Sequence, residues 1–222
     1  ITIIDNSFAS INKAIMWGRS LYLNIRRFII FQMTINLCAC LIVLFGAFIG
    51  YDSPLTVTQM LWVNLIMDTF AAMALSSLPP DRGVLNEKPR DPNSHIIDRR
   101  MLWRIVLTGS LFFIFLAALW QYMFHIRVSS VEEMVSSEQL RIFFTEVFSL
   151  DKVSMHMTGW EMGVYFSIFV LMQFWNIFNV KYFRTDRCLI LDIIDLFRNP
   201  KIVKESYNKY FLIIAMVIIV GQ

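Results

Sequence analysis

A single carboxylate interrupts the apolar run Leu61-Trp62-Val63-Asn64-Leu65-Ile66-Met67-Asp68-Thr69-Phe70. The apolar segment around this run is long enough to cross a bilayer. A charged side chain near the centre of a membrane helix costs about 2.5–3.5 kcal/mol on insertion scales, so it normally faces a protein interior or an ion path. The run therefore predicts a membrane helix whose polar face, centred on Asp68, carries function.

The composition is typical of a membrane protein. Hydrophobic residues make up 57% of the 222 residues, the mean hydropathy is +0.57, and apolar blocks alternate with polar stretches. This pattern predicts an all-α, multispanning transmembrane helical bundle surrounded by the lipid bilayer. The net charge of +3 is small, which argues against nucleic acid as a partner. Cys38, Cys40 and Cys188 lack the spacing of a metal site, so we expect them to be packing residues.

The apolar blocks predict five helical spans, the last too short to cross alone, at residues 28–49, 57–78, 102–126, 160–182 and 210–222. Residues 1–27 predict an amphipathic stalk helix that runs straight into the first span. We therefore expect a cytoplasmic stalk over residues 1–27 and a transmembrane domain over residues 28–222. Residues 127–159 form an acidic loop, and residues 188–197 predict a helix that lies at the membrane interface.

The basic residues predict the orientation. With the stalk in the cytoplasm, seventeen of the 20 lysine and arginine residues fall on the cytoplasmic side and three on the other. The positive-inside rule favours this arrangement, with the loop 127–159 outside the cytoplasm. Both ends of the chain look cut, since Ile1 is not an initiator methionine and Gln222 lies inside an apolar run. We therefore expect a fragment of a longer polypeptide.

Asparagine and aspartate side chains in two spans are candidates for cation binding. Asn64 and Asp68 are four residues apart and share one face of a helix. The first span has polar interruptions at Gln32, Thr34 and Asn36, of which Asn36 lies well inside the hydrocarbon. Carboxylate and amide oxygens suit Ca²⁺ or a similar hard cation. Because Ca²⁺ takes about six to eight oxygens, further ligands must come from elsewhere.

Two motifs resemble a known family. Asp5-Asn6-Ser7-Phe8-Ala9-Ser10-Ile11, followed by Lys13-Ala14-Ile15-Met16-Trp17-Gly18-Arg19, is similar to the stalk of P-type Ca²⁺ pumps. Gln59-Met60-Leu61-Trp62-Val63-Asn64-Leu65-Ile66-Met67-Asp68-Thr69, with Pro79-Pro80 after it, resembles their sixth transmembrane helix. The resemblance covers nearly the whole chain. It implies that the spans are the fifth to ninth transmembrane helices of a P-type ATPase membrane domain.

The plasma-membrane-type Ca²⁺ pump is the subtype that the chain resembles most. Reticulum-type pumps, which move two calcium ions per cycle, have glutamates at the positions that match Ala39 and Gln173. Because both acids are missing here, the resemblance implies a single Ca²⁺ site built on Asn36, Asn64 and Asp68. We expect Gln173 to form hydrogen bonds rather than to bind the ion directly. The resemblance also implies a multi-pass protein of the plasma membrane.

The resemblance implies an ATP-driven translocase whose ATP and Mg²⁺ bind in other domains. The phosphorylated Asp-Lys-Thr-Gly motif of the family has no counterpart, since Asp151-Lys152-Val153-Ser154 lacks the Thr-Gly. A glycine-rich phosphate loop is also missing. We therefore expect the fragment alone to be inactive. Its partners would be the remainder of the parent chain, namely the other transmembrane helices and the phosphorylation, nucleotide-binding and actuator domains.

The residues leave two alternatives open. The same oxygens suit Mn²⁺ or a monovalent cation, so the parent could pump another ion. The chain could also be a truncated, non-catalytic membrane module that scaffolds or regulates partners. The coding sequence before Ile1 separates the two classes. An Asp-Lys-Thr-Gly motif a few hundred residues upstream would support a pump, and a nearby start codon would support the module.

Overall fold

The computed structural model describes residues 7–49, 53–80, 82–86, 88–89, 95–125, 157–183, 213–214 and 216–217. The regular structure of these residues is helical, with no strand among them, which confirms the all-α prediction. Within these ranges four helical segments are long and apolar enough to cross a membrane: Phe8–Phe48, Val57–Ser76, Arg99–Met123 and Gly159–Lys181. The chain is a multi-pass membrane protein. The predicted loop 127–159, the interfacial helix 188–197 and the fifth span lie largely or wholly outside the described residues.

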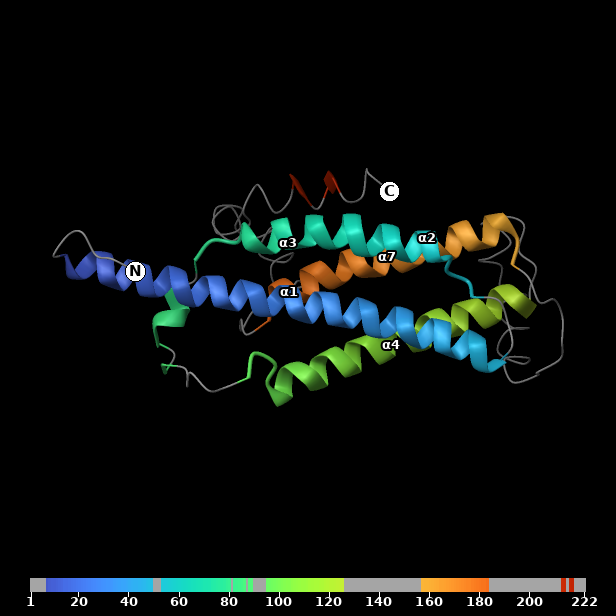
Figure 1. The fold of residues 1–222 in the computed structure, drawn as a ribbon, viewed down its shortest axis with the longest axis horizontal. Helices are drawn as coiled ribbons and strands as arrows, with labels where there is room; N and C mark the ends of the chain where they lie inside the picture. Colours follow the sequence, from blue (N-terminus) through green and yellow to red (C-terminus); the bar gives the residue numbers. More distant parts are fainter. Residues whose placement is uncertain are drawn as a thin grey trace, which may run out of the picture. The chain divides into compact units, whose positions relative to one another are not determined.

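The first helix, α1 (Phe8–Ile49), runs without a break through both the predicted stalk and the first predicted span (Figure 1). Its 42 residues extend for about 63 Å at about 1.5 Å per residue, twice the thickness of a hydrocarbon core of about 30 Å. Its arginines, Arg19, Arg26 and Arg27, all lie in the first half, and no charged residue follows Arg27 within the helix. The division into a cytoplasmic and a membrane part stays a prediction.

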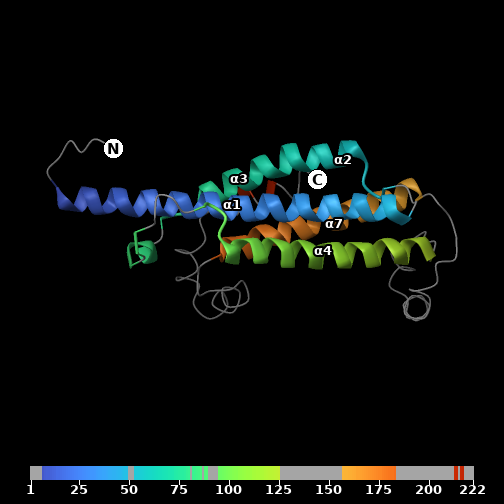
Figure 2. The ribbon, with the colours of Figure 1, turned by 60° about the horizontal axis from the view of Figure 1, so that its bottom comes forward.

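The second span consists of three consecutive helical pieces: α2 (Val57–Trp62), a π-helical segment η1 (Val63–Met67) and α3 (Asp68–Ser76) (Figure 2). A capping box starts it, because Thr56 Oγ1 accepts from the Gln59 N–H (3.2 Å) and Gln59 Oε1 accepts from the Thr56 N–H (2.9 Å). Pro79-Pro80 follows soon after its end. The span matches the prediction of a helix at 57–78 except for the π-helical segment, which the sequence pattern did not indicate.

Side-chain caps also fix the starts of α4 (Arg99–His125) and α7 (Gly159–Lys181). Asp98 Oδ1 accepts from the Met101 N–H at 3.0 Å. Thr158 and Glu161 form a second capping box, with distances of 3.3 and 2.7 Å. Acidic or hydroxyl side chains at these positions satisfy backbone N–H groups that a helix start leaves unpaired.

The chain divides into two compact units, the first comprising Ile1–Gln32, Met67–Trp103 and Phe174–Gln222, the second Met33–Ile66 and Arg104–Gln173. In the first unit, three side chains of α1 reach the ends of other helices. We call Asn24, Arg26 and Arg27 the inner clamp. Asn24 Nδ2 donates to the Leu78 carbonyl (3.5 Å), which follows α3, and Arg27 Nη2 donates to the Phe183 carbonyl (3.4 Å), which follows α7.

Arg26 connects the inner clamp to the start of α4. Its Nη2 lies 2.6 Å from Asp98 Oδ2, and the side chains of the two residues are 6% and 49% exposed. The guanidinium also lies over the Tyr22 and Phe183 rings, 5.9 and 5.4 Å from their centroids. Cation–π contacts of this kind stabilise a cation that has lost most of its water. Nearby, Arg19 Nη1 donates to the Val84 carbonyl (2.9 Å) of the 3-10 helix η2 (Arg82–Asn86).

Aromatic and small side chains pack the second unit. The Phe45 ring of α1 meets Phe113 and Trp120 of α4 edge-on, at centroid distances of 5.6 and 5.9 Å. Gly109 of α4 lies directly against Leu37 of α1, where an added Cβ would come within 2.9 Å of Leu37 Cδ2. The absence of a side chain at residue 109 therefore lets these two helices approach closely.

Replacing Asp98 tests the inner clamp. Asp98→Asn keeps an N-cap oxygen but removes the charge that Arg26 faces, whereas Asp98→Ala removes both. We expect the melting temperature of the purified protein in detergent to fall for Asp98→Asn and further for Asp98→Ala, the extra loss corresponding to about 0.5–2 kcal/mol for the cap. Arg100→Ala, at an exposed position of the same helix start, is the control. Equal melting temperatures for all variants would contradict the clamp.

Replacing Gly109 tests the close contact between α1 and α4. Gly109→Val forces branched methyl groups into Leu37, and overpacking of this kind costs about 1–3 kcal/mol. We expect a lower melting temperature for Gly109→Val and a smaller decrease for Gly109→Ala. Gly163 is the matched control, because an added Cβ there meets nothing within 4 Å among the described residues. A Gly109→Val protein as stable as Gly163→Val would argue against the contact.

Candidate cation site

Asp68 stands at the first position of α3, directly after the π-helical segment. Its side chain is buried, with 7% of the residue exposed. Gln32 of α1 donates a hydrogen bond from Nε2 to Asp68 Oδ2 at 2.5 Å. Both residues belong to the first compact unit. A carboxylate in the apolar part of a membrane helix is thus held by an amide donor from a neighbouring helix.

Each of these two side chains keeps one buried oxygen without a hydrogen-bond partner among the described residues: Asp68 Oδ1 and Gln32 Oε1. Buried polar atoms are normally paired, because an unpaired one costs about 1–3 kcal/mol. Two unpaired oxygens on two side chains that are hydrogen-bonded to each other are suited to water or to a hard cation. No three histidine, cysteine, aspartate or glutamate side chains of the described ranges form a cluster that could hold a metal.

The π-helical segment places Asn64 in the turn before Asp68. Its backbone hydrogen bonds run from i to i+5 instead of i to i+4, an arrangement that is rare and frequently found at functional sites. Asn64 is exposed in the structure, as is Asn36 on α1. Asn36 follows Gln32 by four residues on one uninterrupted helix, so these two amides lie on the same side of α1. The binding roles predicted for Asn36, Asn64 and Asp68 stay predictions.

Two further amides lie on α7. Gln173 and Asn176 are 0% and 1% exposed, and neither side-chain oxygen nor nitrogen of either residue has a hydrogen-bond partner within the described part of the chain. The hydrogen bonds expected for Gln173 are therefore not found there. Because the two residues are three apart, they share one side of α7.

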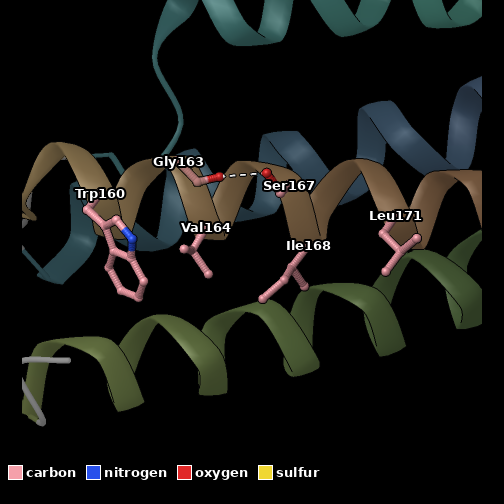
Figure 3. Close-up of a pocket in the computed structure, with 6 residues that line it drawn as sticks. All are labelled: Trp160, Gly163, Val164, Ser167, Ile168 and Leu171. Atoms are coloured by element: carbon pink, nitrogen blue, oxygen red, sulfur yellow. Dashed lines mark hydrogen bonds between the residues drawn. The ribbon is translucent and has the colours of Figure 1, made fainter. Parts of the chain in front are cut away.

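A shallow pocket on α7 is a different feature. It is lined by Trp160, Gly163, Val164, Ser167, Ile168 and Leu171, and Figure 3 shows the larger apolar side chains on one side of the helix. The Ser167 hydroxyl donates to the Gly163 carbonyl at 2.9 Å. With neither an acid nor an amide side chain in its lining, this pocket lacks the ligands of a Ca²⁺ site.

Sequence reasoning missed two residues of this region. In the sequence Gln32 is only a polar interruption of an apolar span, although its spacing of four from Asn36 places it on the same helix face. No sequence motif indicates Asn176, although its spacing of three from Gln173 places the two amides on one side of a helix. The hydrogen bond between Gln32 and Asp68 joins residues 36 positions apart, and no local pattern could have predicted that pairing.

Comparison with known families identifies the class of protein. Residues 52–222 match the family model described as cation transporting ATPase, C-terminus. The match covers most of the chain and includes Asn64 and Asp68. The chain belongs to this family of cation-transporting ATPases and corresponds to their C-terminal region.

Individual relatives agree with the resemblance to plasma-membrane-type calcium pumps. The chain is 34% identical over 205 residues to plasma membrane calcium-transporting ATPase 2 of Oreochromis mossambicus, which covers 90% of this chain and 16% of that protein. It is 47% identical over 106 residues to plasma membrane calcium-transporting ATPase 4 of Homo sapiens, covering 48% and 8%. For plasma membrane calcium-transporting ATPase 1 of Oryctolagus cuniculus the identity is 36% over 188 residues, covering 84% and 14%. The chain thus spans a sixth or less of the length of these relatives.

Removing the amide donor tests the pairing of Gln32 with Asp68. Gln32→Leu leaves a buried carboxylate without its donor, and we expect a loss of about 1–3 kcal/mol, read as a lower melting temperature in detergent with chelator present. Adding Asp68→Leu replaces both polar partners by apolar ones, which should restore the melting temperature.

The control for this pair is Met33→Leu at the neighbouring exposed position of α1, which should change little. If the double variant were as unstable as Gln32→Leu alone, the effect would come from packing at residue 32 and not from the unpaired carboxylate.

Proposed function

We propose that the chain is the ion-translocating membrane part of an ATP-driven Ca²⁺ pump of the plasma membrane, and that it forms most of a single intramembrane Ca²⁺ site. The observation that carries the proposal is the buried carboxylate of Asp68, held by Gln32, with one free oxygen on each side chain. The names of the relatives support Ca²⁺ as the ion. Intramembrane acids at protein-facing positions commonly mark ion paths.

The proposed ligands are Asn36, Asn64 and Asp68. Asp68 supplies the negative charge and its unpaired carboxylate oxygen Oδ1, and the two asparagines supply amide oxygens. Gln32 orients the carboxylate and can offer its own Oε1. Since Ca²⁺ takes about six to eight oxygens, the rest come from water and from other helices of the parent pump. The exposure of Asn36 and Asn64 is compatible with contacts to such helices.

The stalk would transmit the energy of ATP hydrolysis. ATP and Mg²⁺ bind in cytoplasmic domains of the parent, which transfer a phosphoryl group to an aspartate there. The resulting motion reaches the membrane through α1, whose 42 residues form one helix. A tilt of α1 moves Gln32 and Asn36 relative to Asp68 and changes the ligand geometry. The ion is then released to the opposite side, as alternating access requires.

Neutralising Asp68 tests the proposed function. In membrane vesicles that carry the full-length pump, Asp68→Asn should abolish ATP-dependent ⁴⁵Ca²⁺ uptake while nucleotide binding stays intact, because the amide keeps the size of the side chain but not its charge. Asn36→Ala and Asn64→Ala should raise the Ca²⁺ concentration for half-maximal uptake, because each removes one ligand.

Glu161→Gln is the matched control, because it neutralises another buried acid on a membrane helix but keeps an oxygen for the capping box. Normal uptake with Asp68→Asn would refute the site. Uptake that is absent in the wild type would refute Ca²⁺ as the cargo, and a screen of Mn²⁺ and monovalent cations for stimulated ATP hydrolysis would then identify the ion.

A further inference from the structure

Asn176 is a buried polar residue that neither the sequence motifs nor the proposed ligand set explains. It lies on α7, is 1% exposed, and keeps both Oδ1 and Nδ2 without hydrogen-bond partners among the described residues. An asparagine in an apolar helix loses stability relative to leucine unless its amide is solvated. Asn176 belongs to the same compact unit as Gln32 and Asp68.

A hydrogen bond between the middle of α1 and the end of α7 places Asn176 along the two helix axes. Arg27 of α1 donates to the carbonyl of Phe183, just after α7, and the two helices run in opposite directions in both views (Figures 1 and 2). Asn176 is seven residues before Phe183, and Gln32 is five residues after Arg27. At about 1.5 Å per residue, they lie about 10 and 8 Å from this contact along their helices. Asn176 is therefore at nearly the depth of Gln32 and of the Asp68 carboxylate that Gln32 contacts.

We propose that Asn176 is a further positioning residue of the cation site, and that its amide binds a water molecule that belongs to the shell of the ion at Asp68. This inference rests on the proposed function. Buried waters typically make about three hydrogen bonds to otherwise unpaired polar groups. The Asn176 amide, Asp68 Oδ1 and Gln32 Oε1 are among the buried groups without a hydrogen-bond partner in the described part of the first unit. Such a water adds an oxygen to a site that has too few protein ligands for Ca²⁺.

The test compares two asparagines of α7 in the full-length pump. Asn176→Leu should raise the Ca²⁺ concentration for half-maximal ⁴⁵Ca²⁺ uptake about tenfold or more, as expected when an outer-shell partner of a metal is lost. Asn179 is exposed and lies three residues further on. Asn179→Leu should change the Ca²⁺ concentration for half-maximal uptake by no more than about twofold, well below the change expected for Asn176→Leu. Asn176→Asp, which keeps the size and an acceptor oxygen, should retain uptake at low Ca²⁺.

A second readout separates positioning from a structural role. Because leucine replaces an unpaired buried amide, Asn176→Leu should melt at the wild-type temperature or above it in chelator, yet gain less stability from added Ca²⁺. Unchanged Ca²⁺ affinity in Asn176→Leu, together with loss of uptake in Asp68→Asn, would overturn this inference alone. Normal uptake in Asp68→Asn would overturn the proposed function and this inference with it.

Discussion

The arrangement of the first compact unit depends on the burial of one cation, the guanidinium of Arg26. A buried charge is stable only when it is paired and hydrogen-bonded. Arg26 meets this condition through Asp98, which is also the N-cap of α4, and through two aromatic rings. The same carboxylate therefore satisfies both a buried guanidinium and the start of a helix. Because Asp98 both pairs with Arg26 and caps α4, α4 begins beside Arg26 of α1.

Asp68 poses the opposite problem, a buried anion without a buried cation beside it in the described structure. Its partner is the neutral amide of Gln32, which stabilises one oxygen and leaves the other free. A fully paired ion pair would hold the carboxylate tightly and would compete with a cation for it. An amide donor orients the carboxylate without neutralising it, so the charge stays available to a cation. Under the proposed function, the difference between Arg26 and Asp68 is a difference between a charge that stabilises the fold and a charge that binds the ion.

The sequence predicted most of the fold and part of the candidate site. Long apolar runs in lipid form helices, because lipid offers no partner for backbone polar groups. The helices over residues 57–76, 99–125 and 159–181 begin and end within a few residues of the predicted spans. The hydrophobic pattern could not predict the π-helical segment at Val63–Met67, because this segment contains no proline or glycine that would indicate an irregular helix. Asp68 stood out because an acid in such a run is costly. Gln32 and Asn176 did not, because amides in membrane helices are common and their importance here depends on which neighbours fold against them.

The inner clamp affects the position of Asp68, because α1 contacts the second span and the residue after it at two points along its axis. Asn24 contacts the carbonyl of Leu78, and Gln32 contacts Asp68. The two α1 residues are eight positions apart, about 12 Å along the helix. Two contacts on one rigid helix fix its tilt as well as its distance. A tilt of about 10° about Asn24 displaces Gln32 by about 2 Å, which is enough to break a hydrogen bond of 2.5 Å. The geometry of the Asp68 carboxylate is therefore sensitive to the direction of the stalk, whereas the contact at Asn24 lies at the pivot and survives the same motion.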